Sequence, residues 1–346
     1  MRVEHLRERL RSIGAGPDHE RRVLRQWAQA LPQDGGRRAI ASFLPQALRK
    51  ELPALAAELA GLARLKSQYP ADDGSARLLV ELADGQTVES VLLPRGGLCV
   101  STQVGCAVGC VFCMSGRGGL VRQLGSAEIV AQVALARSLR PVRKVVFMGM
   151  GEPSHNLDNA LEAIELLGTE GAIGHKSLVF STVGDARVFE RLPLCRVKPA
   201  LALSLHSTDA AKRASLLPRA PRIAPAELIA EGERYARATG YPIQYQWTLL
   251  DGVNDGDDEF DAVAELLAGK YAMLNLIACN PVAGLEWRSP SVERITAILC
   301  GLNARGVLTC LRHSAGQAVD GGCGQLRARS LGSRSAADAH STRVDR

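Results

Sequence analysis

Apolar residues follow two different spacings along the chain, and the change between them predicts where one part of the molecule ends. The first 65 residues contain no strand-like alternation, and their apolar positions recur at helical intervals. Two such sets are Leu24, Trp27 and Leu31, and then Leu52, Leu55, Leu59 and Leu62. From about residue 76 short β-rich runs begin, first ARLLVEL and TVESVLLP on either side of a turn at Asp84-Gly85. We therefore predict a small helical accessory domain over residues 1–75.

The remainder of the chain repeats one order of elements: an apolar strand, a polar loop and a helix. The run KVVFMGMGEP precedes the helical pattern NLDNALEAIELLG, and further strand candidates are LVFST, ALALSLH, IQYQWTLL, MLNLIACNP and GVLTCLR. Strands that alternate with helices form a parallel sheet, with functional residues at the carboxyl ends of the strands. About six such units predict an α/β fold, a partial, TIM-like (β/α)6 barrel over residues 76–325. Residues 326–346 lack periodicity, and we expect a mobile basic tail there.

The composition is that of an ordinary folded protein. Hydrophobic residues make up 46% of the chain and charged residues 23%, which excludes wholesale disorder. The sequence has no run of about 18 apolar residues and no signal-peptide core, so we expect a cytoplasmic protein without a membrane partner. Nine cysteines in such a chain favour metal binding or thiol chemistry over a disulfide scaffold.

Positive charge is concentrated at the two ends of the chain. Residues 1–51 contain 11 Lys and Arg against 6 Asp and Glu, and residues 324–346 contain 5 against 2. Such basic ends could attract RNA phosphates, so the helical domain could contact RNA, or they could simply be solvated helix faces. Because aromatic residues make up only 4%, an RNA surface would use arginine and backbone contacts more than stacking.

The string CAVGCVFC is the strongest chemical signal in the sequence. It places Cys106, Cys110 and Cys113 in a C-x3-C-x2-C arrangement directly after a further predicted strand, LCVSTQ. Three thiolates this close on one loop can hold a four-iron four-sulfur cluster and leave one iron open to a substrate or cofactor. A structural zinc site is the competing interpretation, but zinc normally takes four ligands, and no fourth ligand with paired spacing lies nearby.

These motifs resemble a known family of enzymes. CAVGCVFC, with an aromatic residue before its last cysteine, is similar to the cluster motif of the radical S-adenosylmethionine (SAM) superfamily, whose open iron binds SAM and whose cluster cleaves it to a 5′-deoxyadenosyl radical. Over roughly residues 80–325 the chain resembles the RlmN/Cfr branch of radical SAM RNA methyltransferases. The supporting strings are CVSTQVGC at 99–106, GMGEP at 149–153, SLH at 204–206, DGVND at 251–255, NP at 280–281 and CGQL at 323–326.

The resemblance assigns SAM binding to glycine and polar residues at predicted strand ends. Glu152 would accept the ammonium group of SAM beside a turn at Gly151, where the missing side chain lets the backbone approach the ligand. The residues that would contact the carboxylate, ribose or adenine of SAM are Ser181, Ser204, Leu205, His206 and Asn280. Taken singly, a glycine-rich strand exit is more often a plain turn, and such polar residues are more often helix caps or satisfied loop groups.

Cys323 and Cys99 match the two catalytic thiols of this branch, and Glu89 matches its proton acceptor. The resemblance implies that one SAM methylates Cys323, and that the radical from a second SAM takes a hydrogen atom from that methyl group. The carbon radical adds to adenine, a ring proton is lost, and Cys99 attacks the Cys323 sulfur, which leaves a transient disulfide to be reduced. Without the resemblance, both cysteines would be buried small hydrophobes and Glu89 an exposed strand carboxylate.

The resemblance implies a product, partners and cofactors. The favoured product is an adenosine methylated at carbon 2 in ribosomal RNA, and transfer RNA stays open as a further substrate. One 4Fe-4S cluster, two SAM molecules per turnover and an unidentified electron donor are required, and we expect a monomer. The segments MSGRGGL after Cys113 and RHSAGQAVDGG before Cys323 depart from the family pattern, so methylation at carbon 8 or of another RNA stays open.

Two other classes of protein remain. A non-catalytic iron–sulfur protein could bind RNA through the basic ends, although it would not need both Cys99 and Cys323. A radical enzyme acting on a small molecule or peptide is disfavoured by the branch motifs, but not by CAVGCVFC alone. The other cysteines lie in apolar surroundings and are most simply core residues: Cys195, Cys279, Cys300 and Cys310.

Overall fold

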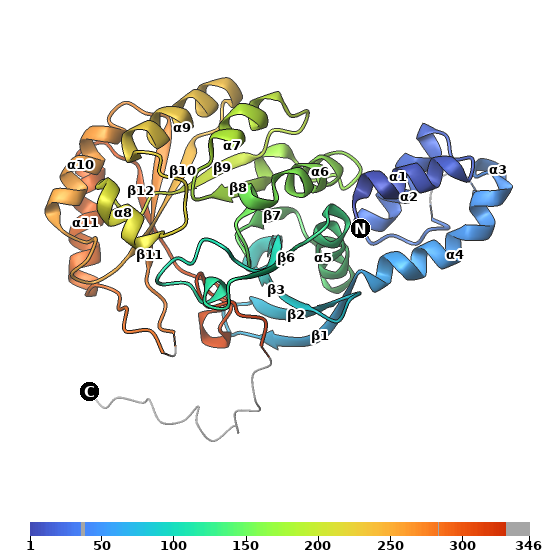
Figure 1. Cartoon of the computed structure of the whole chain (residues 1–346), viewed down its shortest axis with the longest axis horizontal. Coiled ribbons are helices and arrows are strands. Elements are labelled where there is room, and N and C mark those ends of the chain that lie inside the picture. Colours follow the sequence, from blue (N-terminus) through green and yellow to red (C-terminus); the bar gives the residue numbers. More distant parts are fainter. Residues whose placement is uncertain (36–38, 283, 330–346) are drawn as a thin grey trace, which may run out of the picture.

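The computed structural model describes residues 1–35, 39–282 and 284–329, so most of the expected tail, residues 330–346, lies outside the described residues. A ten-stranded sheet forms the centre of the molecule, in the order β1-β2-β3-β4-β7-β8-β9-β10-β11-β12, and β5 pairs with β6 in a separate hairpin (Figure 1). The strands are β1 (Ala63–Pro70), β2 (Ala76–Leu82), β3 (Thr87–Leu93), β4 (Gly97–Cys99), β5 (Gln103–Gly105), β6 (Leu120–Gln123), β7 (Lys144–Phe147), β8 (Leu178–Thr182), β9 (Ala200–Ser204), β10 (Ile243–Leu249), β11 (Ala272–Ala278) and β12 (Thr309–Arg312).

The strands β4 and β7 to β12 are parallel, and helices connect each to the next. Within the described residues this gives six strand–helix units followed by β12, which confirms the predicted partial α/β barrel. Strands such as β9 are buried on both faces because helices cover the outside of the sheet. The helices are α1 (Val3–Ser12), α2 (Pro17–Ala28), α3 (Ile40–Phe43), α4 (Gln46–Gly61), α5 (Ser126–Leu139), α6 (Leu157–Gly168), α7 (Ala186–Arg191), α8 (Ala210–Leu216), α9 (Pro225–Thr239), α10 (Asp257–Leu267) and α11 (Val292–Ala304).

Three antiparallel strands, β1 to β3, extend the sheet beyond β4. The predicted turn at Asp84-Gly85 joins β2 to β3, and Gly85 adopts a φ of 81° that suits glycine. The sequence did not predict β1, which lies inside the range assigned to the helical domain. After Ala63 the residues of β1, RLKSQYP, are exposed or half-buried. They are therefore mostly polar, and the sequence has no apolar run that would mark a strand.

The four N-terminal helices form a group that packs beside α5 and α6 (Figure 1). The start of the chain inserts at the beginning of α5, where the Val3 amide donates to Ser126 Oγ over 2.8 Å. A Cβ on Gly125 would lie 2.0 Å from the Met1 carbonyl oxygen, so this contact requires glycine. Of the apolar positions read from the spacing, Leu31 is 45% exposed because α2 ends before it.

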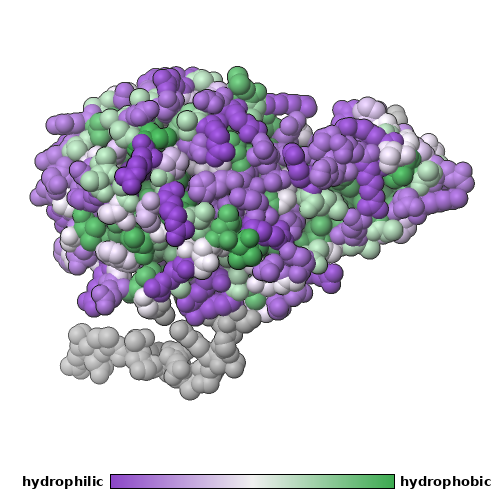
Figure 2. Space-filling view, viewed as in Figure 1, coloured by the Kyte–Doolittle hydropathy of each residue, from purple (hydrophilic) through white to green (hydrophobic). Residues whose placement is uncertain are grey.

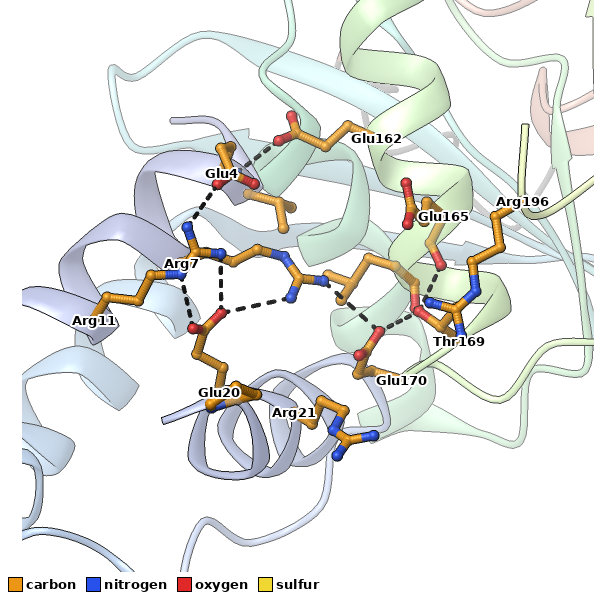
Figure 3. Close-up of a pocket in the computed structure, with 13 residues that line it drawn as sticks. Glu4, Arg7, Arg11, Glu20, Arg21, Glu162, Glu165, Thr169, Glu170 and Arg196 are labelled. Carbon is orange, nitrogen blue, oxygen red and sulfur yellow. Dashed lines mark hydrogen bonds and ion pairs between the residues drawn. The ribbon is translucent and has the colours of Figure 1, made fainter. Parts of the chain in front are cut away.

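Ion pairs line the contact between this helical group and the barrel. Figure 3 shows a cavity of about 620 Å³ where α1 and α2 meet the end of α6. Glu20 lies within 2.9 Å of Arg11 Nε and 3.7 Å of Arg7 Nη1, and Arg7 Nη2 lies 3.9 Å from Glu170. The charges in this cavity therefore largely compensate one another.

The first residues after the barrel do not form a mobile tail, contrary to the prediction. Leu326 is buried, and the Ala328 carbonyl accepts a hydrogen bond from Thr87 Oγ1 on β3.

None of the described helices is long and apolar enough to cross a membrane. On the face in Figure 2, hydrophobic residues stand in small groups among hydrophilic ones.

Candidate active site

A cavity of about 160 Å³ opens at the carboxyl ends of the parallel strands. Most of the residues predicted to bind a cluster or SAM line this one cavity: Cys106, Cys110, Cys113, Gly151, Glu152, Ser181, Ser204, His206 and Asn280. Leu205 does not line it, because its side chain is fully buried in the barrel core. The convergence follows from topology, since parallel strands present their carboxyl ends at one edge of the sheet.

The three motif cysteines lie on the loop that connects β5 to β6. The Cys106 amide donates to the Gly119 carbonyl at 3.0 Å, and a Cβ on Gly105 would lie only 2.0 Å from the same oxygen. The hairpin therefore closes tightly at the base of the loop. Around the thiols, Val108, Val183, Leu216 and Leu250 form a buried apolar cluster separate from the main core.

The electrostatics of these thiols suit a positively charged metal centre. Burial raises the pKa of Cys106 to about 11, and burial together with the neighbouring Cys113 and Cys106 raises the pKa of Cys110 well above its usual value. A bound metal centre must supply the positive charge that keeps such thiols ionised. Among the described residues, no three His, Cys, Asp or Glu side chains converge closely enough to hold a single ion. The three thiols line one cavity, and cysteine thiolates are the ligands that hold four-iron four-sulfur clusters.

The GMGEP turn presents Glu152 to the cavity. Its carboxylate oxygens accept hydrogen bonds from the amides of Ser154 and Val183, each at 3.0 Å, which fixes the side chain. Gly151 has a φ of 102°, and a Cβ there would lie 2.6 Å from the side chain of Gln103. Gln103 Oε1 in turn accepts from the Glu152 amide at 2.8 Å. A buried carboxylate held in this way can accept an ammonium group.

His206 follows β9 and is a neutral hydrogen-bond donor. Its Nδ1 accepts a hydrogen bond from the Thr248 amide at 2.9 Å, which assigns the ring proton to Nε2. Burial, and then the charge of Arg213, lower its pKa to about 3. The residue has a φ of 59°, and its carbonyl accepts from Asn254 Nδ2 at 2.8 Å. The structure thus holds the imidazole rigidly beside the cavity.

A second cavity of about 330 Å³ contains both predicted catalytic thiols. Cys99 lies at the end of β4 and is buried, whereas Cys323 is exposed on the loop that follows β12. Burial, and then the proximity of Cys323, raise the pKa of Cys99 to about 12. Cys323 also lines the first cavity, so it stands on the wall that the two cavities share. All nine cysteines are free thiols in the described residues, so the expected disulfide is not formed in this state.

Glu89 lies apart from both cavities. It is fully buried on β3, where its carboxylate pairs with Arg77 and accepts the Arg327 amide at 2.8 Å. Burial raises its pKa, and the nearby charge of Arg77 opposes that rise. The structure therefore does not place this carboxylate against a substrate cavity, and it also differs from the exposed strand carboxylate of the plainer interpretation.

Several lining residues were not predicted. Gln246, Thr248 and Arg312 lie on β10 and β12, and Arg312 lines both cavities. The signal for the first two was available, because IQYQWTLL has polar residues at alternate positions within an apolar run. Of the remaining cysteines, Cys279 is buried but Cys300 is exposed on α11, so the expectation of a core position was wrong for Cys300.

A partial barrel with three thiols on one loop is the arrangement expected of a radical SAM enzyme, and comparison with known proteins agrees with this class. Residues 100–267 match the model of the radical SAM superfamily. The chain is 73% identical over 96% of its length to a probable RNA methyltransferase of Methylibium petroleiphilum, covering 94% of that protein. It is 71% identical over 95% of its length to a probable RNA methyltransferase of Azoarcus, again covering 95% of that protein.

A solved structure resembles the whole chain. The crystal structure of a radical SAM methyltransferase from Sphaerobacter thermophilus superposes with a TM-score of 0.81 at 34% identity, covering 95% of this chain and 98% of that one. The chain belongs to the family of radical SAM RNA methyltransferases and is an enzyme. Membership implies SAM and a 4Fe-4S cluster, which the three-thiol loop fits.

Proposed function

We propose that this enzyme methylates a ring carbon of adenosine, with carbon 2 favoured, through a methyl group carried on Cys323, and that ribosomal RNA is the favoured substrate, with transfer RNA as the alternative. The observation that supports the proposal is the position of Cys323 on the wall between the cofactor cavity and the cavity that contains Cys99. A thiol in that position can receive a methyl group from one side and present it to a base on the other.

The chain's own residues divide the work between binding and thiol chemistry. Glu152 would hold the ammonium group of SAM. His206 would donate a hydrogen bond from Nε2 to SAM in the part of the cavity that Ser181, Ser204 and Asn280 also line. When bound by the three motif thiols, the cluster supplies the electron for reductive cleavage of SAM.

The second thiol completes the reaction. Cys99 attacks the Cys323 sulfur to release the product, which breaks the bond from sulfur to the transferred carbon, forms a disulfide and requires a reductant for the next turnover. Arg312 lines both cavities, and its charge partly offsets the rise in the Cys99 pKa.

The experiment uses three variants of the anaerobically reconstituted enzyme, each with one cysteine replaced by alanine, and incubates each with RNA and SAM. Cys323→Ala should abolish RNA methylation, whereas Cys99→Ala should accumulate a covalent protein–RNA adduct, because the carbon transferred to the base stays bound to sulfur. Cys300→Ala, which removes an exposed thiol on α11, is the matched control and should behave as the unmodified enzyme. Absence of any adduct in Cys99→Ala would contradict the two-thiol scheme.

A second measurement identifies the product. Mass spectrometry of nucleosides from cellular ribosomal and transfer RNA, with and without this protein, should show loss of 2-methyladenosine. Loss of 8-methyladenosine, or of a methylated base confined to another RNA, would overturn the proposed position or substrate while leaving the enzyme class intact.

A further inference from the structure

A buried arginine on β2 lies close to the loop that carries Cys323. Arg77 is only 1% exposed, and its Nη1 donates both to Glu89 Oε1 and to the carbonyl oxygen of Arg329, the latter at 3.1 Å. Its guanidinium carbon lies 4.3 Å from the centre of the Tyr69 ring. Arg77 and Glu89 thus form a buried ion pair in the antiparallel extension of the sheet, and this pair also binds the C-terminal segment of the described chain.

The pair contacts the chain on both sides of Cys323. Before it, Gly321 packs against the Arg77 side chain at ordinary contact distance, since a Cβ on the glycine would lie 3.4 Å from Arg77 Cβ. After it, the Arg327 amide donates to Glu89 Oε2 at 2.8 Å. The hydrogen bond to the Arg327 amide depends on the ion pair, whereas the contact with Gly321 involves only Arg77 Cβ, so loss of the pair should release the segment that follows Cys323.

We propose that Arg77 is a positioning residue for the methyl-carrying thiol. Through Glu89 and the segment Leu326–Arg329 it holds the loop so that Cys323 stands on the wall between the two cavities. The inference rests on the proposed function only for what the thiol does, since the placement of the loop follows from the contacts of Arg77 and Glu89.

The physical reason is the cost of removing hydrogen-bond partners from charged groups. Moving Leu326–Arg329 away from β3 removes one hydrogen bond from the Glu89 carboxylate and one acceptor from Arg77. A hydrogen bond to a charged group contributes more than one between neutral groups, so loss of the bond between the Arg327 amide and Glu89 is costly. The loop is therefore held by these contacts with β2 and β3 in addition to the hydrogen bonds within the loop.

This role also bears on Glu89. Replacement of Glu89 would disturb the loop whether or not the carboxylate accepts a proton from the substrate, so an inactive Glu89 variant alone does not identify a base. Because Arg77 is paired with this carboxylate, the two roles are separated by the step that is measured: methylation of Cys323 by SAM precedes the loss of the ring proton.

The first test measures loop position without SAM or RNA. Hydrogen–deuterium exchange of cluster-loaded, full-length Arg77→Met should be at least about tenfold faster than in the unmodified enzyme at the Arg327 amide. Helix α11 is the internal reference and should not change. The matched control is Arg122→Met, which removes an arginine paired with Asp84 and Glu128 away from the loop. Unchanged exchange at Arg327 would overturn the proposal.

A second variant keeps the test valid if Arg77→Met fails to fold. The double variant Thr87→Val and Asp320→Asn removes the bonds to Ala328 and Arg329 while leaving the buried Arg77–Glu89 pair intact. It should accelerate exchange in Leu326–Arg329 in the same direction by about two- to fivefold. An acceleration of about tenfold or more in this variant would show that these two bonds, rather than the buried pair, hold the segment, and would overturn the proposal.

The third readout separates positioning from general damage. Methylation of Cys323 by SAM, followed by mass spectrometry of the peptide, should show a kcat about tenfold lower in Arg77→Met with the KM for SAM within twofold. Arg77→Lys keeps the charge and should restore part of the rate. Equal losses in kcat and in SAM affinity would contradict a positioning role. If exchange changes as expected but Cys323 is never methylated in any variant, the proposed function fails and the anchoring of the loop stands.

Discussion

The parallel strands and the antiparallel strands hold the Cys323 loop by different kinds of contact. On the parallel side, Asn280 Nδ2 donates to the Cys323 carbonyl at 2.8 Å, and Met114 donates its amide to the Gly324 carbonyl at the same distance. On the antiparallel side, carboxylates accept backbone amides: Asp73 from Gly316 at 2.9 Å and Glu89 from Arg327.

The difference separates two tasks. On the parallel side, Asn280 lines the cofactor cavity and Met114 belongs to the cluster loop. Substitutions there should therefore alter SAM binding and the position of the Cys323 thiol together. Residues on the antiparallel side touch the loop without lining the cofactor cavity, so changes there should alter thiol position alone. The predictions below test whether this separation holds.

Loss of a cluster ligand should have the largest effect. Cys110→Ala leaves two motif thiols on the loop, which cannot hold the cluster with one open iron, so formation of 5′-deoxyadenosine from SAM by the reduced protein should fall below detection. Iron and sulfide analysis provides the independent measurement. Cys300→Ala is the control and should retain both iron and cleavage. Cleavage by Cys110→Ala at the normal rate would show that the cavity is not the cofactor site.

Glu152→Gln should weaken SAM binding without moving the loop. The amide removes the charge that would face the ammonium group, so the KM for SAM in the cleavage reaction should rise by about 10- to 100-fold. Glu165→Gln, on the outer side of α6, is the matched control. Exchange at Arg327 should be unchanged, and faster exchange there would break the separation between the two sides of the sheet.

Some of this architecture could be predicted from the sequence because buried apolar runs and cysteine spacing are local signals. The parallel strands and the cluster loop follow from such signals. Strand β1 and the β5–β6 hairpin could not be found in this way, because β1 has a largely exposed face and β5 has only three residues.

The Arg77–Glu89 pair is an intermediate case. In the β2–β3 register Arg77 pairs with Val91 and Leu79 with Glu89, so Arg77 and Glu89 are diagonal neighbours on one face. The predicted turn joins β2 to β3 but does not specify this register, because Leu82 pairs with Gln86 across a three-residue loop and a two-residue turn at Asp84-Gly85 would shift the pairing by one position. The contact with Arg327 could not be predicted, since Glu89 and Arg327 are 238 positions apart in the sequence.

The buried histidine should make the parallel side sensitive to acid. The unfolded chain protonates His206 near pH 6.5, whereas the folded protein does not until the pH is about 3, because burial and Arg213 depress the pKa. The stability contributed is therefore present above pH 6.5 and is lost as the pH falls toward 3. The free energy of unfolding should drop by about 2 kcal/mol between pH 6.5 and 5 from this group. His206→Gln should show a shallower pH dependence in chemical denaturation, and an identical slope would exclude the assignment.

Asp73→Asn should have a small effect confined to the loop. Burial raises the pKa of Asp73, but hydrogen bonds from Ser75 and Gly316 outweigh it and lower the pKa, so the group is charged where it accepts the Gly316 amide. A neutral amide is a weaker acceptor, and methylation of Cys323 should slow by about two- to threefold with SAM cleavage unchanged. Asp72→Asn removes a neighbouring exposed carboxylate and should leave both rates as they are.

The smallest effect should come from the charged cavity between the helical group and the barrel (Figure 3). Glu20→Gln removes a carboxylate shared by Arg7 and Arg11, which are 21% and 51% exposed, so solvent already screens much of the attraction. We expect a loss of about 1 kcal/mol or less in the free energy of unfolding, decreasing with added salt, and no change in SAM cleavage. Asp18→Asn, an exposed carboxylate paired with Arg21 in the same helix, controls for the charge change. A change in Cys323 methylation in Glu20→Gln but not in Asp18→Asn would mean that the helical group influences the distant thiol, and the division of tasks would then extend beyond the sheet.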